Sequence, residues 1–272
     1  MSLPVGVQIY SVREEAAADF EGTLKRIKEY GYDGVEFAGL YGRSPEEVRA
    51  LCQSIGLVPV SAHVPYADMV ADPEGVLGQY ARIGCSYVAI PYLTPDLRPG
   101  TPGFGQVVEN AAKLGRVAHS LGMQLLYHNH DFEFTRLDGE YALDLLYRSV
   151  PADLLQTEFD TCWVKVAGED PVAYLDRYAG RSPVVHLKDF AGSRSENMYK
   201  LIGIKDDEKQ ASQEKFAFRP IGKGVQDWPP ILEASVRAGA KWLVVEQDSP
   251  SLGLTPLESI RESRAYLKTL GY

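Results

Sequence analysis

The feature that most limits the fold of this chain is an eightfold alternation of apolar, β-rich segments with amphipathic stretches of about 10–18 residues. The segments predicted as strands are Val5–Ser11, a short strand ending at Glu36, Val58–Val64, Tyr87–Leu93, Gln124–Tyr127, Leu154–Asp160, Val184–Phe190 and Trp242–Gln247. Strands that alternate with helices return to the same end of a sheet, so this pattern builds parallel sheets. Eight such units in 272 residues are the count of a (β/α)8 barrel, or TIM barrel. We predict this α/β fold as one domain over residues 1–272.

The amphipathic stretches supply the predicted helices. They lie near Asp19–Tyr30, from Ser44 onward, and at Pro73–Ile83, Gly103–Leu121, Tyr141–Ser149, Pro171–Tyr178, Asp227–Ala238 and Pro256–Leu270. Ser44, Pro45 and Glu47 have the spacing of a capping box with proline at the first helical position. A doubly wound open sheet is the competing fold, but it normally places a glycine-rich turn after its first strand. The corresponding turn here, YSVREEA, contains no glycine, so the barrel is favoured.

Residues 191–224 are much longer than a usual strand-to-helix connection in such a fold. The middle of this segment, KDDEKQASQEK, is highly charged and therefore expected to be solvated. We predict an extended loop after the seventh strand, inserted at the rim of the barrel. It serves either as a lid or oligomer contact, or as a passive surface insertion. The glycine turn PIGKG at its end has the composition of a phosphate-binding turn, although short glycine turns are common.

The charge and the cysteines of the chain limit its possible binding partners and its cellular compartment. A net charge of −9 counts against binding to nucleic acid or to an anionic membrane, because both reward basic surfaces. Cys52, Cys85 and Cys162 are odd in number and form no CxxC pair, which is typical of reduced thiols. The N-terminus enters a strand without a leader-like segment, and no apolar run reaches the roughly 18 residues of a membrane span. We therefore expect a cytoplasmic protein with no membrane or nucleic-acid partner.

Ionisable side chains gather where the predicted strands end. They are Glu36, His63, His128, His130, Asp131, Glu133, Glu158, Asp160, His186, Lys188, Asp189, Glu246 and Asp248. Parallel strands covered by helices are normally apolar throughout, and each buried ionisable group is costly unless it is paired or liganded. The active sites of (β/α)8 barrels lie at this end of the strands. Neutral imidazole and carboxylate groups are ligands of divalent cations, so the pattern favours a metal site over a hydrogen-bonded polar cluster.

The chain resembles the xylose isomerase-like TIM barrels grouped as sugar phosphate isomerases/epimerases. This family includes ketose 3-epimerases and inosose dehydratase and, more distantly, endonuclease IV. The resemblance covers nearly the whole chain and is carried by VQIYSVR, GYDGVEFAG, YHNHDFEF, EFDTCWVKVAGEDP, VHLKDF, PIGKG and VVEQD. Each of these motifs is weak alone, but their order and spacing together are specific.

The resemblance implies one divalent metal ion held by Glu, Asp, His and Glu from strands five to eight. Mn²⁺ is the preferred prediction for this ion, and Mg²⁺, Co²⁺ and Zn²⁺ are alternatives. Asp160, His186 and Glu246 match three of the four ligand positions. Ketose 3-epimerases carry a ligand glutamate where Tyr127 stands in this chain, and a second glutamate at the position of Glu133. Glu133 is therefore the predicted fourth ligand, and His130 is its alternative.

The resemblance also implies an isomerase or epimerase that acts on a sugar, keto-sugar or inositol derivative. Proton abstraction next to a carbonyl would give an enediolate. Glu246 is the predicted base, with Glu133 or Glu158 as its counterpart. The predicted substrate contacts are His63, His128, His130, Lys188 and Trp163. His63 could instead be a hydrogen-bonded core residue, Lys188 an ion-pair partner, and Trp163 rim packing.

Three other functions compete with the isomerase prediction. The first is a metal-dependent lyase or dehydratase that acts on an inosose or a 3-keto-glycoside. The second is a non-catalytic sugar-binding barrel. The third is a phosphodiesterase similar to endonuclease IV, but its multi-zinc site and basic face fit poorly with five histidines and a net charge of −9. The expected partner is a small carbohydrate, and a homo-oligomer is compatible with the extended loop.

Overall fold

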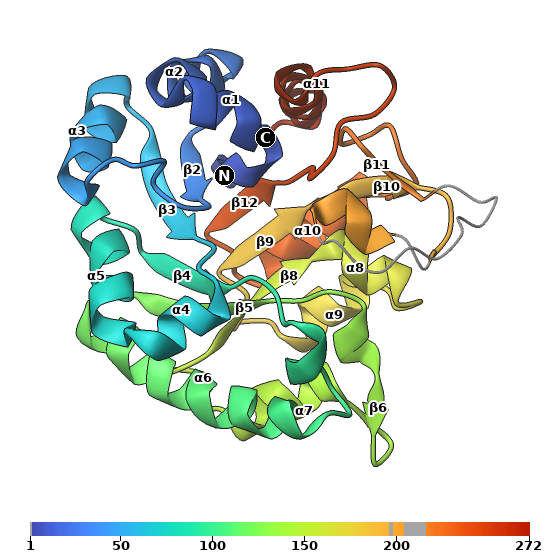
Figure 1. The fold of residues 1–272 in the computed structure, drawn as a ribbon. Helices are drawn as coiled ribbons and strands as arrows, with labels where there is room; N and C mark the ends of the chain where they lie inside the picture. The colour runs from blue at the N-terminus through green and yellow to red at the C-terminus, as the bar shows by residue number, and fades with distance from the viewer. Residues whose placement is uncertain (1, 196–197, 204–215) are drawn as a thin grey trace.

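The computed structural model describes residues 2–195, 198–203 and 216–272, and its strands form one central ring (Figure 1). The eight barrel strands are β1 (Val5–Gln8), β2 (Gly34–Phe37), β3 (Val58–Ala62), β4 (Tyr87–Ile90), β5 (Gln124–His128), β8 (Gln156–Asp160), β9 (Val184–Leu187) and β12 (Trp242–Val245). They pair in parallel in the order β3-β2-β1-β12-β9-β8-β5-β4. The predicted (β/α)8 barrel is confirmed.

The ring closes through a short joint between β3 and β4. His63 and Ala89 form an isolated parallel bridge there. The amide of Val64 donates to the carbonyl of Ala89, and the amide of Ser86 donates to the carbonyl of Val60. Every other pair of neighbouring strands forms a ladder of at least three residue pairs, with one register shift between Val35 and Glu36 in the β2–β3 pair. The β3–β4 joint is therefore the most weakly bonded junction of the barrel.

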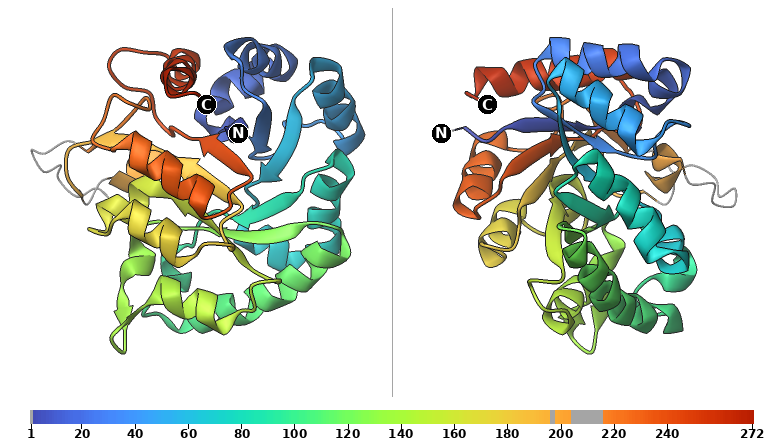
Figure 2. Two further views of the ribbon diagram at one scale, coloured as in Figure 1. Left: turned by 180° about the vertical axis from the view of Figure 1, so that it is seen from behind. Right: turned by 90° about the vertical axis from the view of Figure 1, so that its left-hand side faces the viewer.

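Helices surround the ring of strands, as the two views in Figure 2 show. They are α1 (Arg13–Ala18), α2 (Phe20–Tyr30), α3 (Pro45–Ile55), α4 (Tyr66–Ala71), α5 (Pro73–Ile83), α6 (Pro102–Ser120), α7 (Ala142–Ser149), α8 (Thr161–Val166), α9 (Pro171–Arg177), α10 (Trp228–Arg237) and α11 (Pro256–Thr269). Short 3-10 turns occur at Ile9–Val12, Pro95–Leu97, Phe132–Phe134 and Met198–Ile202. Helix α3 begins with the predicted capping box of Ser44 and Glu47, and ends at Ile55, directly before Gly56, which has a φ of 77°.

The barrel interior is layered because successive side chains of a strand point to opposite faces. Ala89, Leu126, Val184 and Val244 form a small apolar cluster inside the ring. Two residues further along three of these strands are His128, His186 and Glu246. The polar site therefore rests directly on an apolar floor, and the main core lies between the outer face of the sheet and the helices.

The described residues of the 191–224 segment help to form a small hydrophobic core at the rim of the barrel, separate from the main core. β10 (Asp189–Ala191) pairs antiparallel with β11 (Ala217–Arg219). Phe190, Met198, Phe216 and Phe218 pack with Cys162 and Trp163. A further two-stranded ribbon, β6 (Arg136–Leu137) with β7 (Glu140–Tyr141), precedes α7. The charged middle of the segment predicted as a lid or oligomer contact, KDDEKQASQEK, falls wholly within residues 204–215, which lie outside the described residues.

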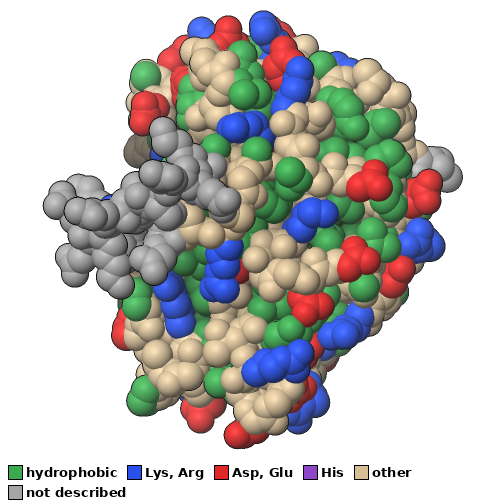
Figure 3. Space-filling model, turned by 90° about the vertical axis from the view of Figure 1, so that its right-hand side faces the viewer, with side chains coloured by type: hydrophobic (Ala, Val, Ile, Leu, Met, Phe, Trp, Pro, Cys, Tyr) green, Lys and Arg blue, Asp and Glu red, His purple; other side chains and the backbone are tan. Residues whose placement is uncertain are grey.

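Two surface observations bear on the predicted partners. No helix within the described ranges is long and apolar enough to cross a membrane. On the face shown in Figure 3, basic and acidic side chains are interspersed rather than collected by sign.

Candidate functional site

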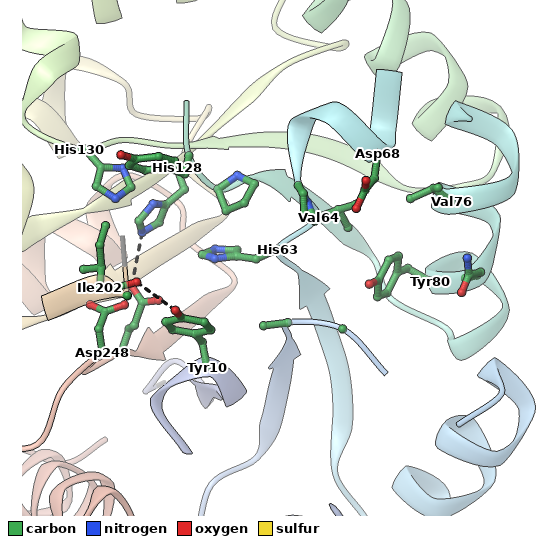
Figure 4. A pocket seen from close by; sticks show the side chains of 18 of the residues that line it. Tyr10, His63, Val64, Asp68, Val76, Tyr80, His128, His130, Ile202 and Asp248 are labelled. Atoms are coloured by element: carbon green, nitrogen blue, oxygen red, sulfur yellow. Dashed lines mark hydrogen bonds and ion pairs between the residues drawn. The ribbon is translucent and has the colours of Figure 1, made fainter. Parts of the chain in front are cut away.

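A cavity of about 740 Å³ opens at the carboxyl ends of the barrel strands (Figure 4). One end of it is bounded by Tyr10, His63, His128, His130, Lys188, Glu246 and Asp248. These residues follow or end five different strands, so the fold brings together side chains that are far apart in the sequence. This is the end of the barrel at which the sequence predicted the site.

Four buried side chains at the base of this cavity form a group that we call the cation cluster: His128, Asp160, His186 and Glu246. Their potential ligand atoms all lie within 4.8 Å of one another. His128 Nε2 is 3.4 Å from Asp160 Oδ2 and 3.6 Å from Glu246 Oε2, and His186 Nδ1 is 3.3 Å from Glu246 Oε2. Both ring nitrogens of His128 and Asp160 Oδ2 have no hydrogen-bond partner. Buried polar atoms are normally bonded, so this donor set fits a divalent cation.

The protonation of His128 agrees with this assignment. Burial would lower the pKa of His128, but the carboxylates of Asp160 and Glu246 outweigh it and raise that pKa above its usual value. Two carboxylates therefore stabilise positive charge at the position of this imidazole. A bound cation would take over the role of that proton, because a metal-binding histidine must be neutral.

The imidazole of His186 is oriented from beneath the cation cluster. Its Nε2 lies 2.7 Å from Glu36 Oε2, and the side-chain amide of Gln8 donates to the same oxygen at 2.8 Å. A neutral His186 that donates its Nε2 hydrogen to Glu36 would have its Nδ1 lone pair on the side of Glu246, where a cation could use it. Carboxylates behind metal-binding histidines commonly fix the ring in this way. Glu36 thus has a positioning role that the sequence prediction did not assign.

A second buried group lies next to the cation cluster and shares His186 with it. His63 Nε2 is 2.8 Å from Glu158 Oε2 and 3.3 Å from Glu36 Oε2. Burial and the charge of Glu36 raise the pKa of Glu158 well above its usual value. Burial lowers the pKa of His63 to about 3, so its imidazole is neutral at neutral pH.

Lys188 links the carboxylates at this end of the cavity. Its Nζ is 2.7 Å from Glu246 Oε2, 2.7 Å from Asp248 Oδ2 and 3.3 Å from Asp160 Oδ2. Burial would lower the pKa of Lys188, but these carboxylates hold it well above its usual value. Burial would likewise raise the pKa of Glu246, yet Lys188 and the two imidazoles hold it well below its usual value. The ammonium group and the Glu246 carboxylate are therefore both charged at neutral pH.

Glu133 is not brought together with Asp160, His186 and Glu246. Its Oε1 accepts a hydrogen bond of 2.6 Å from the Tyr127 hydroxyl, and its Oε2 accepts one of 2.8 Å from the His130 amide. Burial raises the pKa of Glu133 to about 7. Among the described residues, Glu133 belongs to none of the groups that could hold a metal. From the same part of the chain, it is His128 that reaches the cation cluster.

The predicted substrate contacts divide into two sets. His63, His128, His130 and Lys188 line the cavity. Trp163 does not, since it is fully buried and stacks against Tyr199 and Phe216. Its ring lies 5.5 Å from Lys188 Nζ, so Trp163 supports the site through that lysine.

Tyr10 and Asp248 line the cavity, although the sequence prediction gave them no role. Asp248 is two residues beyond Glu246 and so points to the same side, a signal that the strand period contains. Burial raises the pKa of Asp248 to about 6. Tyr10 follows β1 in a 3-10 turn, where the strand period no longer applies, and its hydroxyl donates to the carbonyl of Ile202.

Comparisons with known proteins agree with the observed fold. An inosose dehydratase of Lacticaseibacillus casei is 29% identical over 161 residues, which are 57% of this chain and 50% of the relative. The chain thus spans about half the length of the curated relatives that it matches first. A sugar phosphate isomerase/epimerase from Parabacteroides distasonis superposes with a TM-score of 0.79 at 21% identity, over 98% of this chain and 94% of the other. The IOLI protein, solved with a zinc atom, superposes with a TM-score of 0.71 at 15% identity, over 98% of both chains.

The family of the chain follows from a match that covers more of its residues than the match to the Lacticaseibacillus casei inosose dehydratase does. The model of the xylose isomerase-like TIM barrel family matches residues 24–270, which is most of the chain. This agrees with the resemblance carried by the sequence motifs and with the observed barrel. The chain belongs to the xylose isomerase-like TIM barrel family.

Proposed function

We propose that this protein is a metal-dependent enzyme that removes a proton next to the carbonyl group of a keto-sugar or inositol derivative. The observation that carries this proposal is the cation cluster beside an open cavity, in which both ring nitrogens of His128 and Asp160 Oδ2 are buried without a hydrogen bond. The sugar-related names of the similar proteins support the substrate class.

The proposed ligands are His128, Asp160, His186 and Glu246. This set keeps three of the ligands predicted from the sequence and takes the fourth from the end of β5 rather than from Glu133. Mixed imidazole and carboxylate donors suit Mn²⁺, Co²⁺ or Zn²⁺ better than Mg²⁺, which prefers oxygen ligands. When bound there, a divalent ion polarises a carbonyl oxygen and stabilises the negative charge that develops on it.

Proton transfer is assigned to the wall of the cavity formed by Glu246, Lys188 and Asp248. The ionised Glu246 accepts the proton from the carbon next to the carbonyl. The Lys188 ammonium stabilises negative charge on a neighbouring substrate oxygen. Asp248 is a second carboxylate on the same wall, because both carboxylates contact Lys188 Nζ at 2.7 Å. Neither Glu133 nor Glu158 lines the cavity, so Asp248 replaces them as the counterpart of Glu246.

A lyase is the second candidate, and two observations favour it. The curated relatives that match first are named inosose dehydratase. Furthermore, Glu246 and Asp248 lie on one wall, so a proton that they handle stays on one face of the substrate. Single-face transfer suits an elimination or a shift between adjacent carbons. Inversion of a stereocentre needs a base from another wall, and His130 would be that base.

The test begins with metal analysis of the purified protein, followed by incubation with a 3-keto-glucoside in deuterated water. We expect deuterium at the carbon next to the carbonyl, loss of this exchange with a chelator, and loss of bound metal in Asp160→Asn. The exposed Asp153 offers a matched control, Asp153→Asn, which should retain both. Nuclear magnetic resonance of the product separates an isomer from a dehydrated sugar. A metal-loaded protein that binds keto-sugars without any exchange would contradict the enzyme and indicate a binding protein.

A further inference from the structure

The cavity extends well beyond the cation cluster, toward the helices that follow β3. Figure 4 shows Val64, Asp68, Val76 and Tyr80 gathered at the end opposite Asp248 and His130. We call this end the outer lobe and define it by Ala38, Val64, Pro65, Ala71, Val76 and Tyr80. Cavities of roughly 300–1,000 Å³ accommodate drug-sized ligands, and this one has a volume of about 740 Å³. A single sugar ring placed against the cation cluster leaves the outer lobe unfilled.

The outer lobe is chemically unlike the end that holds the cation cluster. Its six defining side chains are apolar or aromatic, and they come from α4, α5 and the segments that follow β2 and β3, while Asp68, Asp72 and Gln79, in or between the same helices, also line the cavity. The carboxylate of Asp72, which also borders the lobe, accepts the Gly75 amide and caps α5. The six apolar and aromatic side chains favour contact with an apolar group or the face of a ring, because covering them removes apolar surface from water.

The charge around the cavity disfavours a phosphorylated ligand. Carboxylates of Asp68, Asp72, Glu246 and Asp248 line it. Among the described lining residues, Lys188 is the only lysine or arginine, and its ammonium is already paired with carboxylates. A phosphate group would therefore add its charge, about −1.5 to −2, to a negative site.

The turn that resembled a phosphate site does not compensate for this charge. The amides of Gly222 and Gly224 donate to Asp189 Oδ2 at 3.0 and 3.1 Å. The indole of Trp228 donates to the same oxygen at 3.0 Å. An internal carboxylate thus occupies the donors that a phosphate would need in the PIGKG turn.

We propose, on the basis of the function proposed above, that the substrate is an uncharged keto-sugar glycoside. Its sugar lies against the cation cluster, and its aglycone, an apolar group or an aromatic ring, fills the outer lobe. The outer lobe is then an aglycone-binding site that sets which keto-sugars are bound.

Calorimetric titration of the metal-loaded protein tests this proposal with two pairs of ligands. Methyl and nitrophenyl 3-keto-glucosides share the sugar and differ only in the aglycone. We expect the nitrophenyl compound to bind about tenfold tighter or more, because burial of one aromatic ring easily supplies that ratio. Fructose and fructose 6-phosphate differ only in the phosphate, and we expect the phosphate to weaken binding. Equal affinity for the two glucosides, or tighter binding of fructose 6-phosphate, would overturn the proposal.

A matched pair of variants locates the effect. Val76→Glu places a carboxylate inside the outer lobe, whereas Val70→Glu makes the same change at a side chain that is 41% exposed and does not line the cavity. We expect Val76→Glu to abolish the preference for nitrophenyl 3-keto-glucoside over methyl 3-keto-glucoside. Val70→Glu should alter neither. If Val76→Glu does not fold, Ala71→Glu at the exposed end of α4 replaces it.

The two proposals fail in different ways. An aglycone preference that depends on Val76, without deuterium exchange into any keto-sugar, would contradict only the proposed reaction. Exchange into both glucosides with no aglycone preference would contradict only the outer lobe as an aglycone site.

Discussion

Two sets of buried carboxylates in this barrel differ in how completely they are bonded. In the cation cluster, Asp160 Oδ2 and both nitrogens of His128 have no hydrogen-bond partner. Asp189, only a few residues beyond His186, is fully enclosed by donors. Its Oδ1 accepts the amides of Phe190 and Gln226, and its Oδ2 accepts those of Gly222 and Gly224 and the Trp228 indole.

Glu133 belongs with Asp189 in this comparison, because Tyr127 and the His130 amide bond both of its oxygens. All of these carboxylates are buried and lie at the carboxyl ends of the strands. Residue type and position therefore do not distinguish a ligand from a structural group. The bonding of the individual oxygens offers a distinction. A carboxylate whose two oxygens both accept hydrogen bonds from fixed donors has little left to offer a cation, whereas Asp160 keeps one oxygen without such a bond.

The largest effect should come from the cation cluster. Glu246→Gln keeps the shape of the side chain but removes the basic oxygen, so turnover should fall by roughly 10²–10⁴-fold. Metal content should decrease only in part, since three ligands remain. Turnover and metal content are measured together, and Glu109→Gln, at an exposed helical position, is the control. Turnover within a few-fold of the parent would remove Glu246 from proton transfer.

The second effect concerns Asp189 and Glu133, which we call the bonded carboxylates. Asp189→Asn replaces one carboxylate oxygen with an amide that must face amide or indole donors. We expect the free energy of unfolding to fall by about 3 kcal/mol, since several charge-assisted hydrogen bonds are lost together. Urea denaturation measures this loss. Metal bound per folded molecule should not change, and its disappearance would place Asp189 in the functional set.

Glu133 provides a test through pH. Its pKa of about 7 in the folded protein exceeds its ordinary value of 4.5, so between these values the folded state binds more protons than the unfolded state. The free energy of unfolding should therefore fall as pH rises through this range, by at most about 3 kcal/mol.

Glu133→Gln removes the titrating group, so the difference in unfolding free energy between pH 5 and pH 8 should shrink by up to that amount. The same preparation tests the ligand prediction made from the sequence. Retained metal in Glu133→Gln would remove Glu133 from the ligand set, whereas lost metal would restore it at the expense of His128.

Tyr127→Phe should have the smallest effect. It removes one hydrogen bond to Glu133 and leaves the cation cluster untouched. We expect the free energy of unfolding to fall by about 1 kcal/mol and metal content to stay the same. Loss of metal in this variant would show that the hydrogen bond to Glu133 affects metal binding by the cation cluster.

The strand period explains which parts of the site the sequence could predict. Asp160, His186 and Glu246 lie within or just after regular strands, where alternation directs the side chains inward. His128 could have been found in the same way, because it lies two residues after the inward-facing Leu126. Glu133 lies beyond the strand in a 3-10 turn, and the bonds from Tyr127 and His130 determine its direction.

Trp163 shows a different limit of the sequence prediction. Its position on α8 was predictable as part of the rim, but its burial depends on Tyr199 and Phe216, which are 36 and 53 residues away in the chain. The insertion brings these rings over the indole. No local pattern at Trp163 contains that information.

The weak β3–β4 joint has a consequence for how the barrel moves. Local opening of a fold requires the least free energy where the fewest backbone bonds are broken. Amide hydrogens at this joint, including that of Val64, should therefore exchange with solvent faster than those of β1 and β12. Helices α4 and α5 connect β3 to β4 and also form much of the outer lobe. Opening of this joint would consequently widen or narrow the outer lobe while leaving the ligands on β5, β8, β9 and β12 in place.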